Sequence, residues 1–127
     1  MVLGLGTDLI ETRRVQESID RFGERFLERI FTAGEIAYCQ RKKKNAAESF
    51  AARFAAKEAA AKALGTGISR GVSWKELEVR REPGGRPTLH LSGRAAERAA
   101  RMGVRHISLS LTHTRELAMA VVMMEDG

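Results

Sequence analysis

Residues 50–67 read FAARFAAKEAAAKALGTG and contain the strongest helix signal in the chain. Alanine has the best intrinsic helix propensity and the two glycines supply a stop, so we predict a helix over 46–64. Side chains four residues apart lie on one row of a helix. One row begins apolar, ends charged and is expected to leave the core at its third member: Phe50, Phe54, Glu58 and Lys62.

A second row of charges, Arg53 and Lys57, is expected to lie beside the first, with alanine over most of the remaining helix surface. Such small neighbours would leave room for a ligand next to Glu58 and Lys62. The alternative is an ordinary Glu-to-Lys pair on an exposed face, which contributes about 0.2–0.5 kcal/mol in many helices. The helix alone does not decide between these interpretations.

The residues before this helix predict one strand followed by helices. Residues 2–10 form a short apolar run, which indicates a buried strand. Helical periodicity then extends from 11 to about 40, and Thr32 with Glu35 has the form of a capping box that opens a further helix. The basic run RKKK at 41–44 is expected to be a solvated turn.

The residues after the helix predict, in order, strands 77–81 and 88–91, a helix from Ser92 to Met102, and strands 106–112 and 117–125. The sequence Pro83-Gly84-Gly85 is typical of a turn, so the first two strands should form a hairpin. Strands and helices are mixed and some pairs are antiparallel. We therefore predict an α+β fold with an antiparallel sheet and one long alanine-rich helix.

Length and composition favour one compact domain over 1–127, because 127 residues with 43% hydrophobic and 30% charged side chains suffice for a single core. One cysteine and three histidines form neither an internal disulfide nor a recognisable zinc site, which favours a reduced, cytoplasmic setting. The start MVLGLGTDLI does not have the form of a signal peptide, and no apolar run reaches the roughly 18 residues of a membrane span.

The net charge of +6 favours an anionic partner: nucleic acid, an acidic protein or a phosphorylated small molecule. Nucleic acid is disfavoured, because only 6% of the residues are aromatic and most phenylalanines have core spacing. An acidic protein could bind basic and aromatic residues expected along one side of the first helical region. These are Arg14, Arg21, Phe22, Arg25, Phe26 and Arg29, and the alternative is a solvated basic face.

Asp8 and Glu58 are the two carboxylates that stand in otherwise apolar surroundings. Magnesium is commonly held by one or two carboxylates with water and phosphate oxygens, so this pair would suffice if the fold joins them. Asp8 could instead cap the helix that begins near Thr12. The glycine pairs at 4 and 6 and at 65 and 67 would let backbone approach a phosphate closely, although capping explains the second pair equally well.

Five segments together resemble the bacterial holo-acyl-carrier-protein synthases, the small type of 4′-phosphopantetheinyl transferase. They are GLGTDLIETRRV at 4–15, RFLERIFTAGEIAYC at 25–39, SFAARFAAKEAAAKALGTGI at 49–68, GGRPTLHLSG at 84–93 and SLTHTRELAMAVVMME at 110–125. The resemblance covers nearly the whole chain, and the third segment is the most specific.

The resemblance implies transfer of 4′-phosphopantetheine from coenzyme A to a serine of apo-acyl carrier protein, within fatty acid biosynthesis. It implies Mg²⁺ held by Asp8 and Glu58, a catalytic role for Glu58 and Lys62, and a homotrimer with sites between subunits. The proton of the serine would pass to Glu58 or to a metal-activated water. The residues implied to bind coenzyme A are Arg53, Lys62, Gly65, Gly85, Arg86, Pro87 and His113.

The acidic carrier protein would then be the partner of the basic and aromatic residues of the first helical region. One departure lies in the strand over 106–112, where many members of this family have a histidine and this chain has Ser108. Serine cannot replace histidine as a base, and we assign no catalytic role to His106. A coenzyme A binder without catalytic activity therefore stays open as an alternative.

Overall fold

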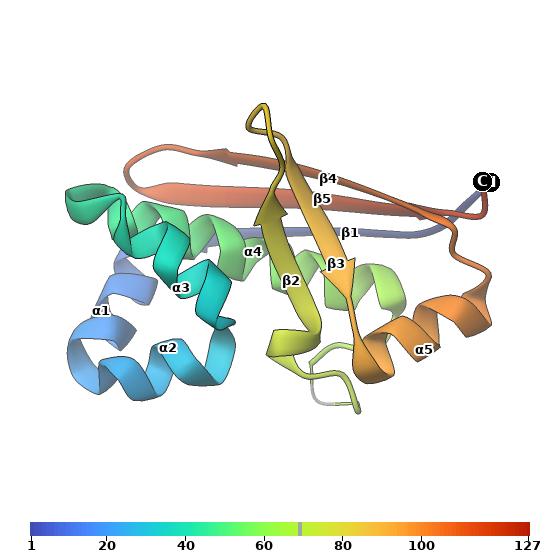
Figure 1. The fold of residues 1–127 in the computed structure, drawn as a ribbon, viewed down its shortest axis with the longest axis horizontal. Coiled ribbons are helices and arrows are strands. Elements are labelled where there is room, and N and C mark those ends of the chain that lie inside the picture. The colour runs from blue at the N-terminus through green and yellow to red at the C-terminus, as the bar shows by residue number, and fades with distance from the viewer. Residues whose placement is uncertain (69) are drawn as a thin grey trace.

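The computed structural model describes residues 1–68 and 70–127 (Figure 1). The helices are α1 (Thr12–Phe22), α2 (Glu24–Ile30), α3 (Ala33–Gln40), α4 (Ala46–Leu64) and α5 (Gly93–Met102). The strands are β1 (Val2–Glu11), β2 (Leu77–Arg81), β3 (Pro87–Leu91), β4 (His106–His113) and β5 (Leu117–Glu125). Two short 3-10 helices are η1 (Lys43–Asn45) and η2 (Trp74–Glu76). The predicted α+β class and element order are confirmed.

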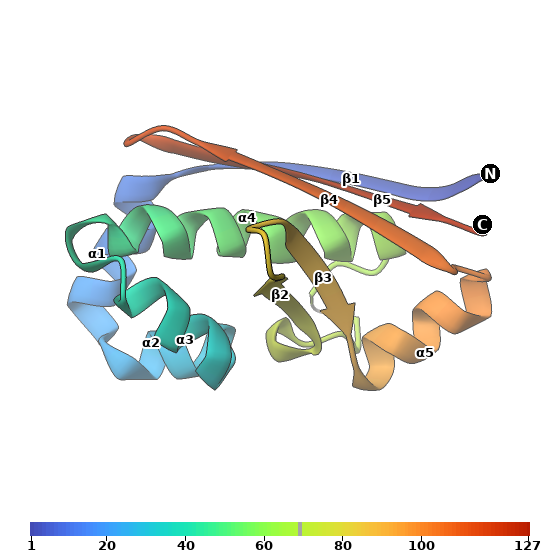
Figure 2. The ribbon, with the colours of Figure 1, turned by 45° about the horizontal axis from the view of Figure 1, so that its top comes forward.

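The sheet and the long helix form the centre of the molecule. β1, β5 and β4 make an antiparallel sheet in that order, while β2 and β3 make a separate antiparallel hairpin. Helix α4 runs along one face of the three-stranded sheet, with α1, α2 and α3 near one of its ends and α5 near the other (Figure 2). The two termini lie side by side, and the terminal ammonium is 2.7 Å from Asp126 Oδ1.

Two glycines of β1 allow the close approach between the sheet and α4. A Cβ atom placed on Gly6 would lie 1.8 Å from the carbonyl oxygen of Ala59, and one on Gly4 would lie 2.1 Å from that of Ala63. Only glycine fits at such distances. The expectation that these glycines approach a phosphate is therefore wrong for Gly4 and Gly6, which contact helix backbone, whereas Gly65 is confirmed as a left-handed C-cap with φ 77°.

The alanines of α4 fill space rather than leave it open. Those at 55, 56, 59, 60 and 61 are completely buried in the core between the sheet and the β2–β3 hairpin. Alanine side chains are short, so they bring the helix axis close to β1 and β5. The prediction that small neighbours leave room for a ligand along this surface is wrong, and any cavity must lie at the edges of α4.

The second row of charges on α4 is also inside the protein. Lys57 and Glu35 are both 0% exposed, and the Lys57 Nζ atom is 2.8 Å from Glu35 Oε1. Lys57 also donates hydrogen bonds to the carbonyl oxygens of Trp74 and Leu77, at 3.0 and 2.9 Å. Glu35 accepts from the backbone N–H groups of Thr32 and Val79. Lys57 of the second row thus belongs to a buried ion pair that joins α3, α4, η2 and β2.

Two further expectations need correction. The strand β1 is not buried on both faces: the side chains that point away from α4 are exposed, with Leu5 at 63% and Leu9 at 62%. The long helical region breaks at Gly23, which has φ 58° and separates α1 from α2. The capping box of Thr32 and Glu35 is confirmed at the start of α3.

Candidate active site

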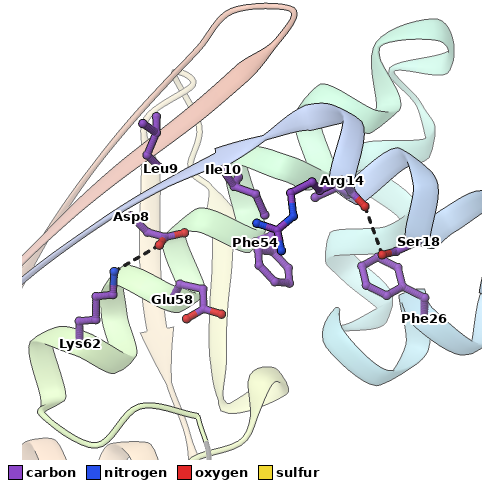
Figure 3. A pocket seen from close by; sticks show the side chains of 10 residues that line it. Asp8, Leu9, Ile10, Arg14, Ser18, Phe26, Phe54, Glu58 and Lys62 are labelled. Carbon is purple, nitrogen blue, oxygen red and sulfur yellow. Dashed lines mark hydrogen bonds and ion pairs between the residues drawn. The ribbon is translucent and has the colours of Figure 1, made fainter.

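A cavity of about 350 Å³ opens between β1, the middle of α4 and the helices α1 and α2. We call it the carboxylate cavity (Figure 3). Its lining residues are Asp8, Leu9, Ile10, Arg14, Val15, Ser18, Phe26, Phe54, Glu58 and Lys62. The two carboxylates singled out in the sequence, which are 50 positions apart, thus share one cavity.

The fold brings Asp8 to α4 through the glycines that precede it. Residues two apart on a strand share a face, so Asp8 points to the same side as Gly4 and Gly6. Lys62 Nζ lies 3.3 Å from Asp8 Oδ1 and donates to the carbonyl oxygen of Thr7 at 3.0 Å. Asp8 therefore contacts the charged end of α4 and does not cap α1, whose N-cap residue is Glu11.

The charges in the cavity leave Glu58 poorly compensated. Burial raises the pKa of Glu58, the negative charge of Asp8 raises it further, and Lys62 only partly opposes both effects. Lys62 donates a hydrogen bond to Asp8, which the dashed line in Figure 3 marks. A cation between the two carboxylates would relieve their repulsion, and one or two carboxylates with phosphate oxygens are a common donor set for Mg²⁺. Within 1–68 and 70–127 no cluster of three His, Cys, Asp or Glu residues suits a metal ion.

Most of the remaining lining of the carboxylate cavity is apolar, with Arg14 and Ser18 as its polar members. Phe54 precedes Glu58 by one helical turn, and Ile10 follows Asp8 on the same face of β1. Val15 and Phe26 close the side toward α1 and α2. A phosphate at the carboxylates would thus lie next to an aromatic and aliphatic wall.

A second cavity, of about 490 Å³, has Lys42, Arg53 and Arg81 in its lining, together with Tyr38. We call it the basic cavity. Its lining residues are Tyr38, Lys42, Asn45, Glu48, Ser49, Ala52, Arg53, Arg81, Pro87, Leu111 and His113. It has no lining residue in common with the carboxylate cavity. The sequence-predicted residues Arg53, Pro87 and His113 line this cavity. Within one chain they therefore lie in a different cavity from Asp8 and Glu58.

Arg53 lies at the back of the basic cavity and is only 2% exposed. Its Nη1 atom donates to Ser49 Oγ at 3.1 Å, and its Cζ atom lies 4.1 Å from the centre of the Tyr38 ring. The Nε atom of Arg53 is buried and has no hydrogen-bond partner among the residues described. A buried guanidinium with a free donor is an unfavourable arrangement unless an anion or water binds it.

The surroundings of Tyr38 confirm the positive character of the basic cavity. Burial by itself would raise the pKa of Tyr38, but Arg81, Lys42 and Arg53 outweigh that effect and lower it. His113 Nδ1 lies 3.4 Å from Glu48 Oε1 at the opening. Groups that lower a phenol pKa also favour a bound phosphate, so this cavity has the electrostatics of an anion site.

The hairpin turn between β2 and β3 adjoins the basic cavity. Arg81, which lines the cavity, donates from Nη1 to the carbonyl oxygen of Gly85. Arg86 is exposed. Gly65, the other glycine implied to bind coenzyme A, is at the C-terminus of α4, where Arg98 Nε donates to the carbonyl oxygen of Leu64 at 3.0 Å.

The third surface is a groove of about 420 Å³ on α1 and α2, which we call the aromatic groove. It is lined by Phe22, Arg25, Phe26, Arg29, Ile30, Phe54 and Trp74. Phe22 is 51% exposed, and the Arg21 guanidinium lies 5.3 Å from the centre of its ring. The arginines do not follow one continuous helix as predicted: the break at Gly23 puts Arg25 and Arg29 on α2, while Arg14 lines the carboxylate cavity.

Sequence reasoning missed three residues of these surfaces. Trp74 stacks on Phe54 with ring centres 4.9 Å apart and forms part of the aromatic groove. Its being the only tryptophan was a signal, because a single large aromatic after a glycine-rich turn needs a packing partner. Tyr38 and Arg81 come from separate elements, and no spacing in the sequence relates them to Arg53.

Comparison with known proteins agrees with this geometry. The profile of the 4′-phosphopantetheinyl transferase superfamily matches residues 4–122. The holo-[acyl-carrier-protein] synthases of Koribacter versatilis and Solibacter usitatus are 56% and 52% identical over 126 residues, which cover 99% of this chain and 100% of each relative.

Solved structures give the same result. The holo-[acyl-carrier-protein] synthase of Neisseria meningitidis has a TM-score of 0.89 and 32% identity, covering 98% of this chain and 99% of the other. The Helicobacter pylori enzyme in complex with coenzyme A has a TM-score of 0.84 and 31% identity, covering 95% and 99%. The chain therefore belongs to the 4′-phosphopantetheinyl transferase superfamily and, within it, to the holo-[acyl-carrier-protein] synthase family.

Proposed function

We propose that this protein is a Mg²⁺-dependent holo-[acyl-carrier-protein] synthase. It transfers 4′-phosphopantetheine from coenzyme A to a serine of apo-acyl carrier protein and releases adenosine 3′,5′-bisphosphate, serving fatty acid biosynthesis in the cytoplasm. The observation that carries the proposal is the meeting of Asp8, Glu58 and Lys62 in one cavity of a chain that matches this family over nearly its full length.

Asp8 and Glu58 are the residues that would hold the metal ion. Their pairing in one cavity fits Mg²⁺, because the raised pKa of Glu58 marks a site with more negative charge than its surroundings compensate. When bound, the ion would neutralise charge on the pyrophosphate of coenzyme A.

Lys62 supplies the remaining positive charge at the leaving phosphate. Its ammonium group already reaches Asp8 and the Thr7 carbonyl at the edge of the cavity, and its side chain is 54% exposed. Phosphoryl transfer depends mainly on positioning and on stabilising charge at the leaving oxygen. Lys62 is well placed for the second of these tasks.

Glu58 is our candidate to accept the proton of the attacking serine. Burial and the neighbouring Asp8 raise the pKa of Glu58, which makes its carboxylate a stronger base than an ordinary glutamate. The serine would enter from the side of α1 and α2, where the carboxylate cavity meets the aromatic groove at Phe26 and Phe54.

The aromatic groove and the arginines around it would bind the acyl carrier protein. Phe22 and Phe26 offer apolar contacts, and Arg21, Arg25 and Arg29 offer charges that complement an acidic partner. Arg14 would contact the partner where it reaches the carboxylate cavity. Electrostatic complementarity of this kind accelerates association and weakens with salt.

The basic cavity would bind the adenosine end of coenzyme A, with Arg53 and His113 near its 3′-phosphate and Gly85, Arg86 and Pro87 beside the adenine. Gly65 would line the phosphate path at the end of α4. Arg53 and Glu58 are five positions apart on α4, which separates them by about 140° around the helix axis. One molecule of coenzyme A would therefore use the carboxylate cavity of one subunit and the basic cavity of another.

A homotrimer assembled through the outer face of the three-stranded sheet would provide this arrangement. That face exposes Leu5 and Leu9 on β1 and Leu117 and Met119 on β5. Contiguous exposed apolar side chains of this kind mark an interaction surface. The trimer would cover this apolar face while it completes the coenzyme A site.

The function is tested by intact-mass analysis of apo-acyl carrier protein after incubation with this protein, coenzyme A and Mg²⁺. The proposal expects a gain of one phosphopantetheinyl group, and no gain when the metal is chelated. Binding of coenzyme A without any mass gain, across several carrier proteins, would instead identify a non-catalytic binder and direct attention to Ser108.

Shared sites are tested by mixing two inactive variants, Glu58→Gln and His113→Ala, through co-expression and purification of mixed oligomers. A site shared between subunits predicts recovered activity in the mixture, because some interfaces combine an intact carboxylate cavity with an intact basic cavity. Mixed oligomers that form and remain inactive would contradict the shared site.

No helix in the described chain is long and apolar enough to cross a membrane.

A further inference from the structure

Trp74 is attached to α4 at two points. Its indole ring stacks on Phe54, with ring centres 4.9 Å apart and an angle of 30° between the rings. Its backbone carbonyl oxygen accepts a hydrogen bond from Lys57 Nζ at 3.0 Å. Phe54 and Lys57 are three positions apart and therefore lie on the same side of the helix. The ring and the backbone of one residue are thus both held by α4.

We propose that Lys57 is a positioning residue for the aromatic groove. By holding the backbone at Trp74, it fixes the indole ring as one wall of the groove, where the ring contacts the acyl carrier protein. Lys57 itself is completely buried and touches no substrate. This inference rests on the proposed function, since it takes an acidic carrier protein as the occupant of the groove.

All three donors of the Lys57 ammonium group are used in this arrangement. One N–H meets Glu35 Oε1 at 2.8 Å, and the others meet the carbonyl oxygens of Trp74 and Leu77 at 3.0 and 2.9 Å. Trp74 is the first residue of η2, and Leu77 directly follows its last residue. Lys57 therefore spans the whole of η2, a short 3-10 helix whose own hydrogen bonds have poor geometry.

Stability alone is a weak reason for this buried pair. Taking Lys57 and Glu35 out of water is costly, and apolar side chains of similar size in place of a buried ion pair are often neutral or stabilising. Apolar side chains could not, however, bind two backbone carbonyls in fixed directions. The contribution specific to Lys57 is therefore the position of η2 and of the indole ring that η2 carries.

The position of the indole ring suits an acidic protein partner. Trp74 shares the groove with Phe22 and Phe26, and the exposed Arg25 and Arg29 also line it. Tryptophan and arginine are prominent among the residues that contribute most to protein–protein binding, and the arginines complement acidic side chains. A ring that is held before the partner arrives loses little conformational freedom on binding.

The first measurement uses fluorescence, because Trp74 is the single tryptophan of the chain. Acrylamide quenching of the free protein reports how accessible the indole ring is. The test variant combines Glu35→Gln with Lys57→Met, so that no carboxylate is left buried without its cation. We expect its quenching constant to rise by about twofold, because a loosened segment is open to solvent more of the time.

The second measurement is steady-state transfer to apo-acyl carrier protein. In the double variant the KM for carrier protein should rise about fivefold or more, the range expected when a large anchoring side chain is lost from an interface. The dissociation constant of coenzyme A and kcat should change by less than about twofold, because neither residue lines the carboxylate cavity or the basic cavity. A general loss of folded protein would not produce this split.

Three single variants serve as controls. Trp74→Ala should raise the KM for carrier protein as much as the double variant does, whereas Trp74→Phe keeps an aromatic ring on Phe54 and should retain most of the affinity. Lys75→Met removes an exposed lysine from the same 3-10 helix. Because Lys75 does not line the groove, its loss should leave both the quenching constant and the KM unchanged.

Lys57→Arg takes the place of the double variant if that variant does not fold. Arginine keeps a positive charge opposite Glu35, but its planar guanidinium does not reproduce the three bonds of the ammonium group. Both the quenching constant and the KM for carrier protein should rise in Lys57→Arg as well.

Unchanged quenching and an unchanged KM in the folded variant, or an unchanged KM in Trp74→Ala, would overturn the inference and leave the transferase proposal intact. A wild-type protein that modifies no carrier protein would contradict the proposed function instead. The quenching comparison needs no substrate, so it would still test whether Lys57 holds Trp74 in place.

Discussion

Lys57 and Glu58 are neighbours on α4, yet they lie in opposite kinds of environment. Lys57 is completely buried, and its ammonium group meets Glu35 and two backbone carbonyls. Glu58 faces a cavity, carries a raised pKa and has no ion pair or hydrogen bond among the described residues. A buried charge whose partners are all satisfied stabilises structure, whereas a charge left uncompensated in a cavity is available for chemistry.

The largest effect should follow from breaking the buried pair. Lys57→Met leaves the Glu35 carboxylate buried without its cation, which should lower the free energy of unfolding by about 3–5 kcal/mol. Urea unfolding measures this change. The matched control is Lys62→Met, because Lys62 pairs with Asp8 at the surface and such pairs contribute about 0–1 kcal/mol. Similar losses of unfolding free energy in Lys57→Met and Lys62→Met would contradict the distinction between the buried row of Lys57 and the row of Glu58 and Lys62.

A substitution in the carboxylate cavity should lower turnover and leave the free energy of unfolding nearly unchanged. Asp8→Asn removes one of the two carboxylates that would hold the metal ion, and we expect kcat/KM to fall by about a hundredfold or more. Its unfolding free energy should change by less than about 1 kcal/mol, since the ion pair that Asp8 makes among the described residues is with the exposed Lys62. A stability loss as large as that of Lys57→Met would show that Asp8 is structural.

The raised pKa of Glu58 predicts two effects of pH with known sign. The folded protein holds this proton more tightly than the unfolded chain, so the stability contributed by protonated Glu58 is lost as pH rises from the usual glutamate range through the folded pKa. Glu58→Gln should therefore be at least as stable as wild type at pH 7. Unfolding curves at pH 4 and 7 test this, and a variant less stable than wild type only at pH 7 would contradict it.

The same pKa affects activity in the other direction. A general base must be deprotonated, so turnover at low metal should fall as pH drops through a value above the ordinary range of glutamate. At saturating metal, bound Mg²⁺ would lower the pKa of Glu58 toward the usual range of glutamate. The pH dependence of kcat should therefore differ between saturating and low metal. Identical profiles at both metal concentrations would argue against Glu58 beside the metal.

The smallest effect concerns exposed charges that contact no buried group. Arg21→Glu should raise the KM for carrier protein severalfold at low salt, and the difference should shrink as ionic strength increases. Coenzyme A binding should stay unchanged, because Arg21 lines neither cavity. Equal effects on both substrates would remove the carrier-protein role from this surface.

Much of the fold could be predicted from local sequence, because alanine propensity, the capping box of Thr32 and Glu35, and the glycine stop at Gly65 act over a few residues. The break at Gly23 escaped prediction, since the hydrophobic periodicity continues across it. The burial of Lys57 also escaped, because its partners are Glu35 and carbonyls at positions 74 and 77, far away in the chain.

Only part of the candidate site could be predicted from local sequence. Asp8 and Glu58 stood out as carboxylates in apolar surroundings, but only the fold brings them together, through two glycines that let β1 approach α4. The basic cavity combines Tyr38, Arg53 and Arg81 from three elements, and no sequence pattern relates them. Helical spacing singled out Arg53, but only the resemblance to the family gave Arg53 and His113 a role in binding coenzyme A.

The most direct test of the contrast between the two rows is intact-mass analysis of apo-acyl carrier protein treated with Glu58→Gln in saturating Mg²⁺ and coenzyme A. The account predicts a folded protein, with a circular dichroism spectrum and Tm like those of wild type, that adds no phosphopantetheinyl group during many wild-type turnovers. Full modification at the wild-type rate would show that Glu58 is neither metal ligand nor base.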